Sequence, residues 1–159
     1  MSVDVITKLK EQAGVAGRVW LRDGPVSYAD LLDETGRLAN ALEAFGLVKG
    51  DRLLLQVEKC EAVLSIYLAC LRVGVVFLPV NPGYTLAETG HFLSDAEPAL
   101  VVTEPARVSG LGARAIALDD LLAMAEGQAT SFADPDHAPD DLAAILYTSG
   151  TTGRSKGVM

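Results

Sequence analysis

The sequence predicts an α/β fold in which helices flank a mainly parallel sheet, and two observations predict it. Residues 53–55 and 75–78 are continuously apolar, as is typical of strands that are covered on both faces. Such runs alternate along the chain with segments of helical periodicity, which is the order expected of right-handed βαβ units. Half of the 159 residues are hydrophobic, so the chain has enough apolar surface for a core of this kind.

The N-terminal third of the chain predicts a helix, a strand and a second helix. Apolar residues at helical spacing predict the first helix over residues 3–13, and residues 18–22 predict a short strand. Ser27 and Asp30 fit a capping box at the start of the second helix. Behind this box, apolar residues recur at i, i+3 and i+4 until Gly46 ends the helix.

The middle of the chain predicts a strand, a buried helix and another strand. Residues 52–57 predict the first of these strands, and residues 60–73 are apolar nearly all round, which predicts a deeply buried helix. Residues 62–80 are apolar enough to imitate a membrane span. Because Arg72 and Gly74 interrupt this stretch, we expect a helix, a turn and a strand there, and no membrane span.

A second capping box, from Thr85 to Glu88, starts the next helix. We expect this helix to end before Pro98, because the residue that precedes a proline avoids the α region. Residues 99–102 and 114–118 then predict two further strands.

The last quarter of the chain predicts a helix, a connector and a strand. Asp119 is expected to cap a short helix. Residues 127–140 are acidic, contain prolines and lack periodicity, so they predict an exposed connector. Residues 142–147 predict the final strand, which delivers a glycine-rich loop at residues 147–157. In parallel sheets, ligands bind outside the carboxyl ends of the strands, where this loop would lie.

The composition excludes several classes of function. The formal net charge is -8, which argues against a nucleic-acid partner because phosphate backbones require clustered Lys and Arg. Residues 1–4 include an acid and no apolar core follows them, so we expect no signal peptide. Cys60 and Cys70 would lie about 15 Å apart on one helix, too far for a disulfide. Reduced cysteines predict a cytoplasmic protein.

The other polar candidates have ordinary structural interpretations, so neither a catalytic residue nor a metal ligand is assigned among them: His91, His137, Asp140, Asp141, Arg52 and Lys59. His137 has acidic neighbours in the sequence, but a solvated acidic loop is favoured over a metal site. Asp140 and Asp141 are interpreted as a solvated turn rather than as paired catalytic carboxylates.

The loop at residues 147–157 is the most informative stretch of the chain. Its glycines let the backbone approach an anion closely, and successive N–H groups can form an anion-binding nest. Lys156 adds a mobile positive charge. The loop is not a Walker A motif, because Lys156 follows Ser155 instead of a glycine. Phosphate binding is favoured over a flexible Gly/Ser/Thr tail, because a predicted strand leads directly into the loop.

The run Tyr-Thr-Ser-Gly-Thr-Thr-Gly at residues 147–153 resembles the phosphate-binding signature of the adenylate-forming enzymes. These comprise acyl-CoA synthetases, nonribosomal-peptide adenylation domains and luciferases. The resemblance extends over the whole chain and implies that residues 1–159 form an incomplete N-terminal portion of the AMP-binding domain. It also implies that the following residues hold the β- and γ-phosphates of ATP: Thr148, Ser149, Gly150, Thr151, Thr152, Gly153 and Lys156.

Shorter motifs at residues 58–59, 84–86, 95–98, 141–146 and 154–156 resemble the malonyl-CoA synthetase subgroup. This resemblance implies an ATP-dependent carboxylic acid–CoA ligase with malonate as its acid. The carboxylate would attack the α-phosphorus of Mg-ATP, and the thiol of coenzyme A would then displace AMP. Another fatty-acyl or aryl-CoA ligase is the alternative within this class.

The resemblance also implies that the family's magnesium-binding glutamate and its catalytic lysine lie downstream of Met159. We therefore expect this chain alone to be inactive. An alternative from another class is a truncated remnant that binds only a nucleotide or a partner. If the sheet normally continues into further strands, its exposed apolar edge would favour self-association.

Overall fold

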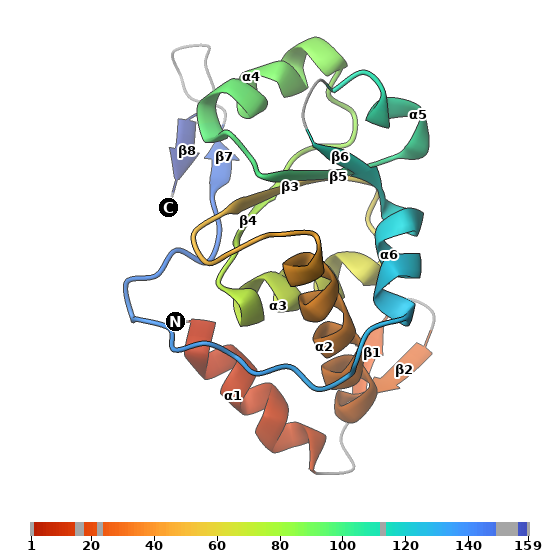
Figure 1. Ribbon diagram of the computed structural model, residues 1–159, viewed down its shortest axis with the longest axis vertical. Helices are drawn as coiled ribbons and strands as arrows, with labels where there is room; N and C mark the ends of the chain where they lie inside the picture. Colours follow the sequence, from red (N-terminus) through yellow and green to blue (C-terminus); the bar gives the residue numbers. More distant parts are fainter. Residues whose placement is uncertain (1, 15–17, 22–23, 112–113, 149–155, 159) are drawn as a thin grey trace.

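The structure is a computed structural model that describes residues 2–14, 18–21, 24–111, 114–148 and 156–158 (Figure 1). Its centre is a parallel four-stranded sheet with the order β4-β3-β5-β6. These strands are β3 (Arg52–Gln56), β4 (Val76–Pro79), β5 (Leu100–Thr103) and β6 (Ala115–Ala117). The helices are α1 (Ser2–Ala13), α2 (Tyr28–Ala44), α3 (Glu61–Val73), α4 (Leu86–Ala96), α5 (Pro105–Val108) and α6 (Leu118–Glu126). The predicted fold class is confirmed.

Side chains of the central strands alternate between two apolar cores. Leu53 and Leu55 of β3 belong to the core that also contains residues of α2, α3 and α6. Leu54 belongs to the opposite core, together with Phe92 of α4. Figure 1 shows α4 on one side of the sheet and α2, α3 and α6 on the other. Because both faces are covered, the strands carry no polar stripe, as the continuous apolar runs predicted.

Capping residues begin two of the helices where the sequence predicts them. The Ser27 hydroxyl accepts a hydrogen bond from the backbone N–H of Asp30 at the start of α2. At α4 the capping box is complete, since Thr85 and Glu88 each accept from the other's backbone N–H. Helix α6 differs, because its N-cap is Ala117 and no side chain caps it. The prediction that Asp119 caps this helix is therefore wrong; Asp119 lies within the first turn.

Two short elements were missed by sequence reasoning. Strand β2 (Gly24–Ser27) pairs antiparallel with β1 (Arg18–Leu21), and α5 follows β5. Strand β2 and helix α5 are each four residues long. Such a short segment does not complete enough repeats for its periodicity to be recognised.

The predicted strand at residues 142–147 is only partly a strand. Strand β7 (Leu146–Thr148) pairs antiparallel with β8 (Lys156–Val158) to form a separate hairpin. Upstream of it, Ala144 makes an isolated parallel bridge to Phe77 of β4. The segment therefore does not add a full strand to the main sheet. Leu146 is 54% exposed, so the described part of the chain has no second layer that would bury a longer strand here.

Residues 127–140, which we call the strap, contain no helix or strand. The strap is partly exposed, and it is also anchored to α2. The Asn40 side-chain amide donates to the carbonyl oxygens of Ala129 and Ser131, both at 2.9 Å. Arg72 of α3 donates to the carbonyl oxygen of Phe132 at 3.3 Å. The strap is thus fastened across α2 and α3 before the chain enters the hairpin.

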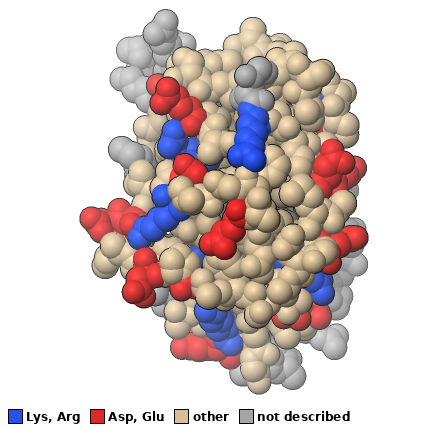
Figure 2. Space-filling view, in the orientation of Figure 1, with Lys and Arg blue, Asp and Glu red and all other residues tan. Residues whose placement is uncertain are grey.

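No helix in the described part of the chain is long and apolar enough to cross a membrane. The apolar stretch at residues 62–80 consists of α3, the turn at Gly74 and β4, as predicted. On the face shown in Figure 2, Lys and Arg side chains lie among Asp and Glu side chains and form no continuous basic patch.

Candidate functional site

The β7–β8 hairpin lies beside the carboxyl end of β4. The backbone N–H of Phe77 donates to the carbonyl oxygen of Ala143 at 3.1 Å, and the N–H of Ile145 donates to the carbonyl oxygen of Phe77 at 3.0 Å. Because this bridge is parallel, the chain leaves Ala144 in the same direction as β4. The segment that follows Thr148 therefore starts at the carboxyl edge of the sheet, where α/β proteins bind ligands.

The structure brings the two ends of the predicted phosphate-binding loop together. Thr148 ends β7, Lys156 begins β8, and the two residues are paired across the hairpin. The remaining predicted residues lie outside the described part of the chain: Ser149, Gly150, Thr151, Thr152 and Gly153. The hairpin register thus fixes where the loop starts and returns.

Gly157 has a steric role in this hairpin. A Cβ at this position would lie 3.0 Å from Cγ2 of Ile145 and 3.5 Å from Cζ of Tyr147. The first distance is shorter than ordinary van der Waals contact. A glycine therefore lets the backbone of β8 approach the side chains that precede the loop.

Tyr147 connects the hairpin to α4. Its hydroxyl donates to Oδ2 of Asp95 at 2.5 Å, and its ring packs edge-on against Phe92 with centroids 4.7 Å apart. Burial, together with the hydrogen bond to the Asp95 carboxylate and its negative charge, raises the pKa of Tyr147 to about 12. The phenol is therefore protonated at neutral pH and acts as a donor. Sequence reasoning assigned Asp95 no role, because a contact between residues 52 positions apart leaves no local signature.

A buried amide holds the segment between β4 and α4. Gln56 is fully buried, and its Nε2 donates to the carbonyl oxygens of Asn81 and Tyr84. Its Oε1 accepts from the Thr89 hydroxyl at 3.1 Å. Since each polar group of this side chain has a partner, Gln56 is a structural residue that fixes the carboxyl edge of the sheet.

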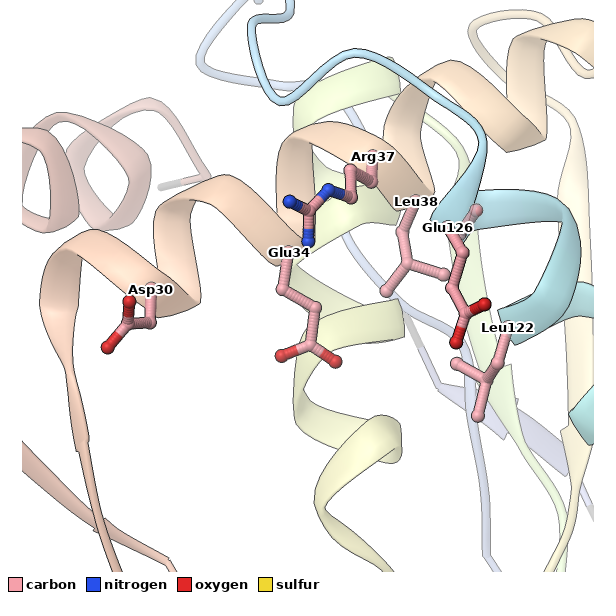
Figure 3. Close-up of a pocket in the computed structure, with 7 residues that line it drawn as sticks. Asp30, Glu34, Arg37, Leu38, Leu122 and Glu126 are labelled. Carbon is pink, nitrogen blue, oxygen red and sulfur yellow. The ribbon is translucent and has the colours of Figure 1, made fainter.

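One hollow lies beside the hairpin, and another lies away from it. One, of about 570 Å³, has a mostly apolar lining that includes Cys60, Tyr67 and Leu146 beside the hairpin. The other, of about 410 Å³, lies between α2 and α6 and combines acidic side chains with Arg37 (Figure 3). The second hollow takes no residue from the strand ends or the hairpin, so it is separate from the candidate site.

His137 fastens the strap and is not part of a solvated loop as predicted. Its side chain is only 7% exposed, with Nε2 lying 3.2 Å from the carbonyl oxygen of Arg72 and Nδ1 lying 3.8 Å from Asp141. Lys49 forms an ion pair with Asp141 at 2.5 Å. The hydrogen bond from Lys49 is the main reason that the pKa of Asp141 lies below its usual range. Among the described residues, no group of three His, Cys, Asp or Glu side chains could hold a metal ion.

The other polar candidates also have structural positions. Arg52 is more than a surface charge, because its guanidinium donates to the carbonyl oxygens of Ala96 and Glu97 at the end of α4. Cys60 and Cys70 are free thiols, and only Cys60 is exposed. Burial raises the pKa of the Cys70 thiol.

A protein-family profile described as AMP-binding enzyme matches residues 10–159. The chain belongs to the AMP-binding enzyme family. MatB from Rhodopseudomonas palustris, solved without ligand and with ATP bound, is similar over 100% of this chain, with a TM-score of 0.88 and 41% identity. Tyrocidine synthase 3 of Brevibacillus parabrevis and feruloyl-CoA synthase of an Amycolatopsis species are each 34% identical over 84% of this chain.

The chain spans 34% of MatB, 28% of the feruloyl-CoA synthase and 2% of tyrocidine synthase 3. Its fold is that of the N-terminal domain of adenylate-forming enzymes. The resemblance found in the sequence is thus confirmed at the level of the family. The relatives include both acid–CoA ligases and peptide synthetases, so family membership alone does not define the acid.

Proposed function

We propose that this chain is the N-terminal part of an ATP-dependent carboxylic acid–CoA ligase, in which residues 147–157 hold the β- and γ-phosphates of ATP. The hairpin register is the observation that carries the proposal. It pairs Thr148 with Lys156 at the carboxyl edge of the sheet, in a chain that is similar to an ATP-bound MatB along its whole length. The phosphate contacts are proposed at Thr148, Ser149, Gly150, Thr151, Thr152, Gly153 and Lys156.

In the proposed reaction, the carboxylate attacks the α-phosphorus of ATP and pyrophosphate leaves, giving an acyl-adenylate. The sulfur of coenzyme A then attacks the acyl carbon and AMP leaves. Positioning and charge neutralisation dominate catalysis of phosphoryl and nucleotidyl transfer, and a glycine-rich loop with one lysine provides both. We propose that Mg²⁺ arrives with the nucleotide, and that, as the resemblance to the family implies, its protein ligand is a glutamate outside residues 1–159.

We propose malonate as the acid, because the motifs at residues 58–59, 84–86 and 154–156 resemble malonyl-CoA synthetases. A fatty-acyl or aryl-CoA ligase is the second candidate, and it is supported by the 34% identity to feruloyl-CoA synthase. No acid-binding residue is assigned on this chain. The two candidates therefore differ only in the acid, and the proposed phosphate site is the same for both. The two free thiols favour a cytoplasmic setting for either enzyme.

Self-association is proposed for the chain on its own. Leu142, Leu146 and Val158 are exposed, and Leu146 also lines the apolar hollow of about 570 Å³. Apolar surface of this kind favours contact with another chain. Sedimentation that shows only a monomer over a wide range of concentration would contradict this expectation.

The test of phosphate binding is calorimetric titration of the 159-residue protein with inorganic triphosphate and with ATP. Lys156→Ala is expected to weaken both affinities by about tenfold or more, because a charge-assisted contact is lost. Lys8→Ala is the matched control, since Lys8 is an exposed lysine of α1, away from the hairpin, and the affinity of this variant should be unchanged. Equal affinities for the two variants would refute the proposed site.

Catalysis needs a separate measurement. The 159-residue protein is expected to show no ATP–pyrophosphate exchange with malonate, because no catalytic residue is assigned on it. Exchange that depends on malonate would show that the described chain is sufficient for adenylation and would overturn this part of the proposal.

A further inference from the structure

Tyr147, the first residue of the loop at residues 147–157, is held by an acidic side chain on a different element. Tyr147 lies in β7, and its hydroxyl donates to Oδ2 of Asp95 in the last turn of α4 at 2.5 Å. The Tyr147 ring packs against Phe92, which is 3% exposed and stacks on Tyr84 with centroids 5.4 Å apart. Tyr147 thus has one polar contact and one apolar contact with α4.

Helix α4 is itself fixed to the central sheet at both ends. Its capping box defines the first turn, and the Thr89 hydroxyl donates to the fully buried Gln56 of β3. At the other end, Arg52 donates to the carbonyl oxygens of Ala96 and Glu97, at 2.7 and 2.6 Å. Asp95 is therefore attached to β3 through neighbours on both sides, and its carboxylate has a defined position.

The hairpin has few other attachments among the described residues. Backbone hydrogen bonds at Phe77 join the segment just before the hairpin to the main sheet. Leu146 and Val158 are each more than half exposed. Tyr147 is paired with Gly157 across the hairpin, and its ring lies over the place where a Cβ of that glycine would be. The position of Tyr147 therefore influences both strands that lead into the loop.

We propose that Asp95 and Tyr147 are positioning residues for the phosphate-binding loop, with the carboxylate on α4 holding the phenol and, through it, the paired ends of the loop. This inference rests on the proposed function of that loop. A loop with fixed ends loses less conformational entropy when it closes around a ligand. Removal of the bond between Asp95 and Tyr147 should therefore weaken binding of polyphosphate while the fold is retained.

The charge of Asp95 allows a positioning role to be distinguished from direct electrostatic repulsion of the phosphate ligand. A carboxylate near an anion-binding loop repels phosphate, so its removal would by itself tighten binding. Loss of positioning predicts the opposite sign. Tyr147→Phe separates the two effects further, because it breaks the hydrogen bond and leaves the Asp95 charge in place.

The experiment is calorimetric titration of the 159-residue protein with inorganic triphosphate. Tyr147→Phe and Asp95→Ala are each expected to weaken binding by about fivefold to tenfold, and the double variant should be no weaker than either single variant. Tyr84→Phe is the matched control, because it removes a hydroxyl from the same aromatic cluster and leaves both the stacking on Phe92 and the bond between Asp95 and Tyr147 in place. Its affinity should equal that of the unchanged protein.

A spectroscopic titration checks that the hydrogen bond exists in solution. Ionisation of the Tyr147 phenol, followed by ultraviolet absorbance, should require a pH of about 12. That phenol should disappear in Tyr147→Phe and should ionise at lower pH in Asp95→Ala. Circular dichroism establishes that the variants are folded, and Asp95→Leu, which keeps a side chain of similar bulk and offers no acceptor to the Tyr147 hydroxyl, replaces Asp95→Ala if the latter unfolds.

The outcomes separate this inference from the proposed function. If the unchanged protein does not bind triphosphate, the proposed function fails and the inference fails with it. If the unchanged protein binds triphosphate and both single variants bind it as tightly as the unchanged protein does, only the inference is overturned. The same holds if Asp95→Ala binds triphosphate more tightly than the unchanged protein.

Discussion

Gly36 lies in α2 at the point where the strap crosses the helix. A Cβ at this position would lie 1.7 Å from the carbonyl oxygen of Thr130 and 2.7 Å from its carbonyl carbon. These atoms belong to the backbone, so a side-chain rotation cannot relieve the clash. In Gly36→Ala the first distance must roughly double to reach ordinary contact, and the strap has to move away from α2.

That movement has a cost that can be worked out from the anchors of the strap. Asn40 loses its hydrogen bonds to the carbonyl oxygens of Ala129 and Ser131, and the buried Arg72 loses its bond to Phe132. A neutral hydrogen bond contributes about 1 kcal/mol and one to a charged group about 2 kcal/mol. Alanine regains about 1 kcal/mol through its higher helix propensity. We therefore expect Gly36→Ala to lower the free energy of unfolding by about 2–4 kcal/mol.

Gly90→Ala is the matched control. Gly90 is also inside a helix, α4, and a Cβ there would meet nothing within 4 Å. This variant should gain about 0.5–1 kcal/mol from helix propensity alone. Urea unfolding followed by far-UV circular dichroism measures both variants. If Gly36→Ala proves as stable as Gly90→Ala, the strap is not held against α2 and the reasoning is refuted.

Three further predictions follow from the same contacts. Burial by itself would raise the pKa of Asp134. Its hydrogen bonds and ion pairs with Arg72 and Lys10 nevertheless hold that pKa below its usual range. The stabilisation is present at neutral pH and is lost as the pH falls below about 4, so Asp134→Asn should lower the urea midpoint at pH 7 and much less at pH 3. A thiol reagent should label Cys60 in the folded protein and Cys70 only after unfolding; labelling of both thiols without denaturant would contradict the buried position of α3. Gly74→Ala should lower the free energy of unfolding by about 1–2 kcal/mol, because Gly74 ends α3 with a φ of 83° and a side chain is strained there. A stability equal to that of the unchanged protein in the same urea assay would argue against this left-handed turn.

Local patterns predicted most of the helices and strands. The capping box from Thr85 to Glu88 and the apolar runs of β3 and β4 depend on residues within a few positions of one another. Backbone geometry at that range is set by propensity, by caps and by the side-chain period. Asp119 shows the limit of such reasoning, because α6 begins one residue before the expected cap and directly follows β6.

The contacts that hold the strap could not be predicted from its composition. Its acids and prolines predicted an exposed connector, and most of its residues are exposed. They did not predict its bonds to Asn40 and Arg72, which are 60 or more positions away. Such bonds link side chains to backbone carbonyl groups, which every residue carries. These backbone bonds therefore leave no signature in the sequence of the strap, and its ion pair from Asp134 to Arg72 links residues 62 positions apart.

The sequence by itself determined the family, and the continuous signature at residues 147–153 predicted a phosphate-binding loop. Only the tertiary structure decided which strands and side chains flank that run. It placed Thr148 opposite Lys156 in a separate hairpin instead of a full strand of the main sheet, and it brought Asp95 to Tyr147. The physical reason is that strand pairing and contacts between distant residues depend on how layers cover one another, which a local pattern does not specify.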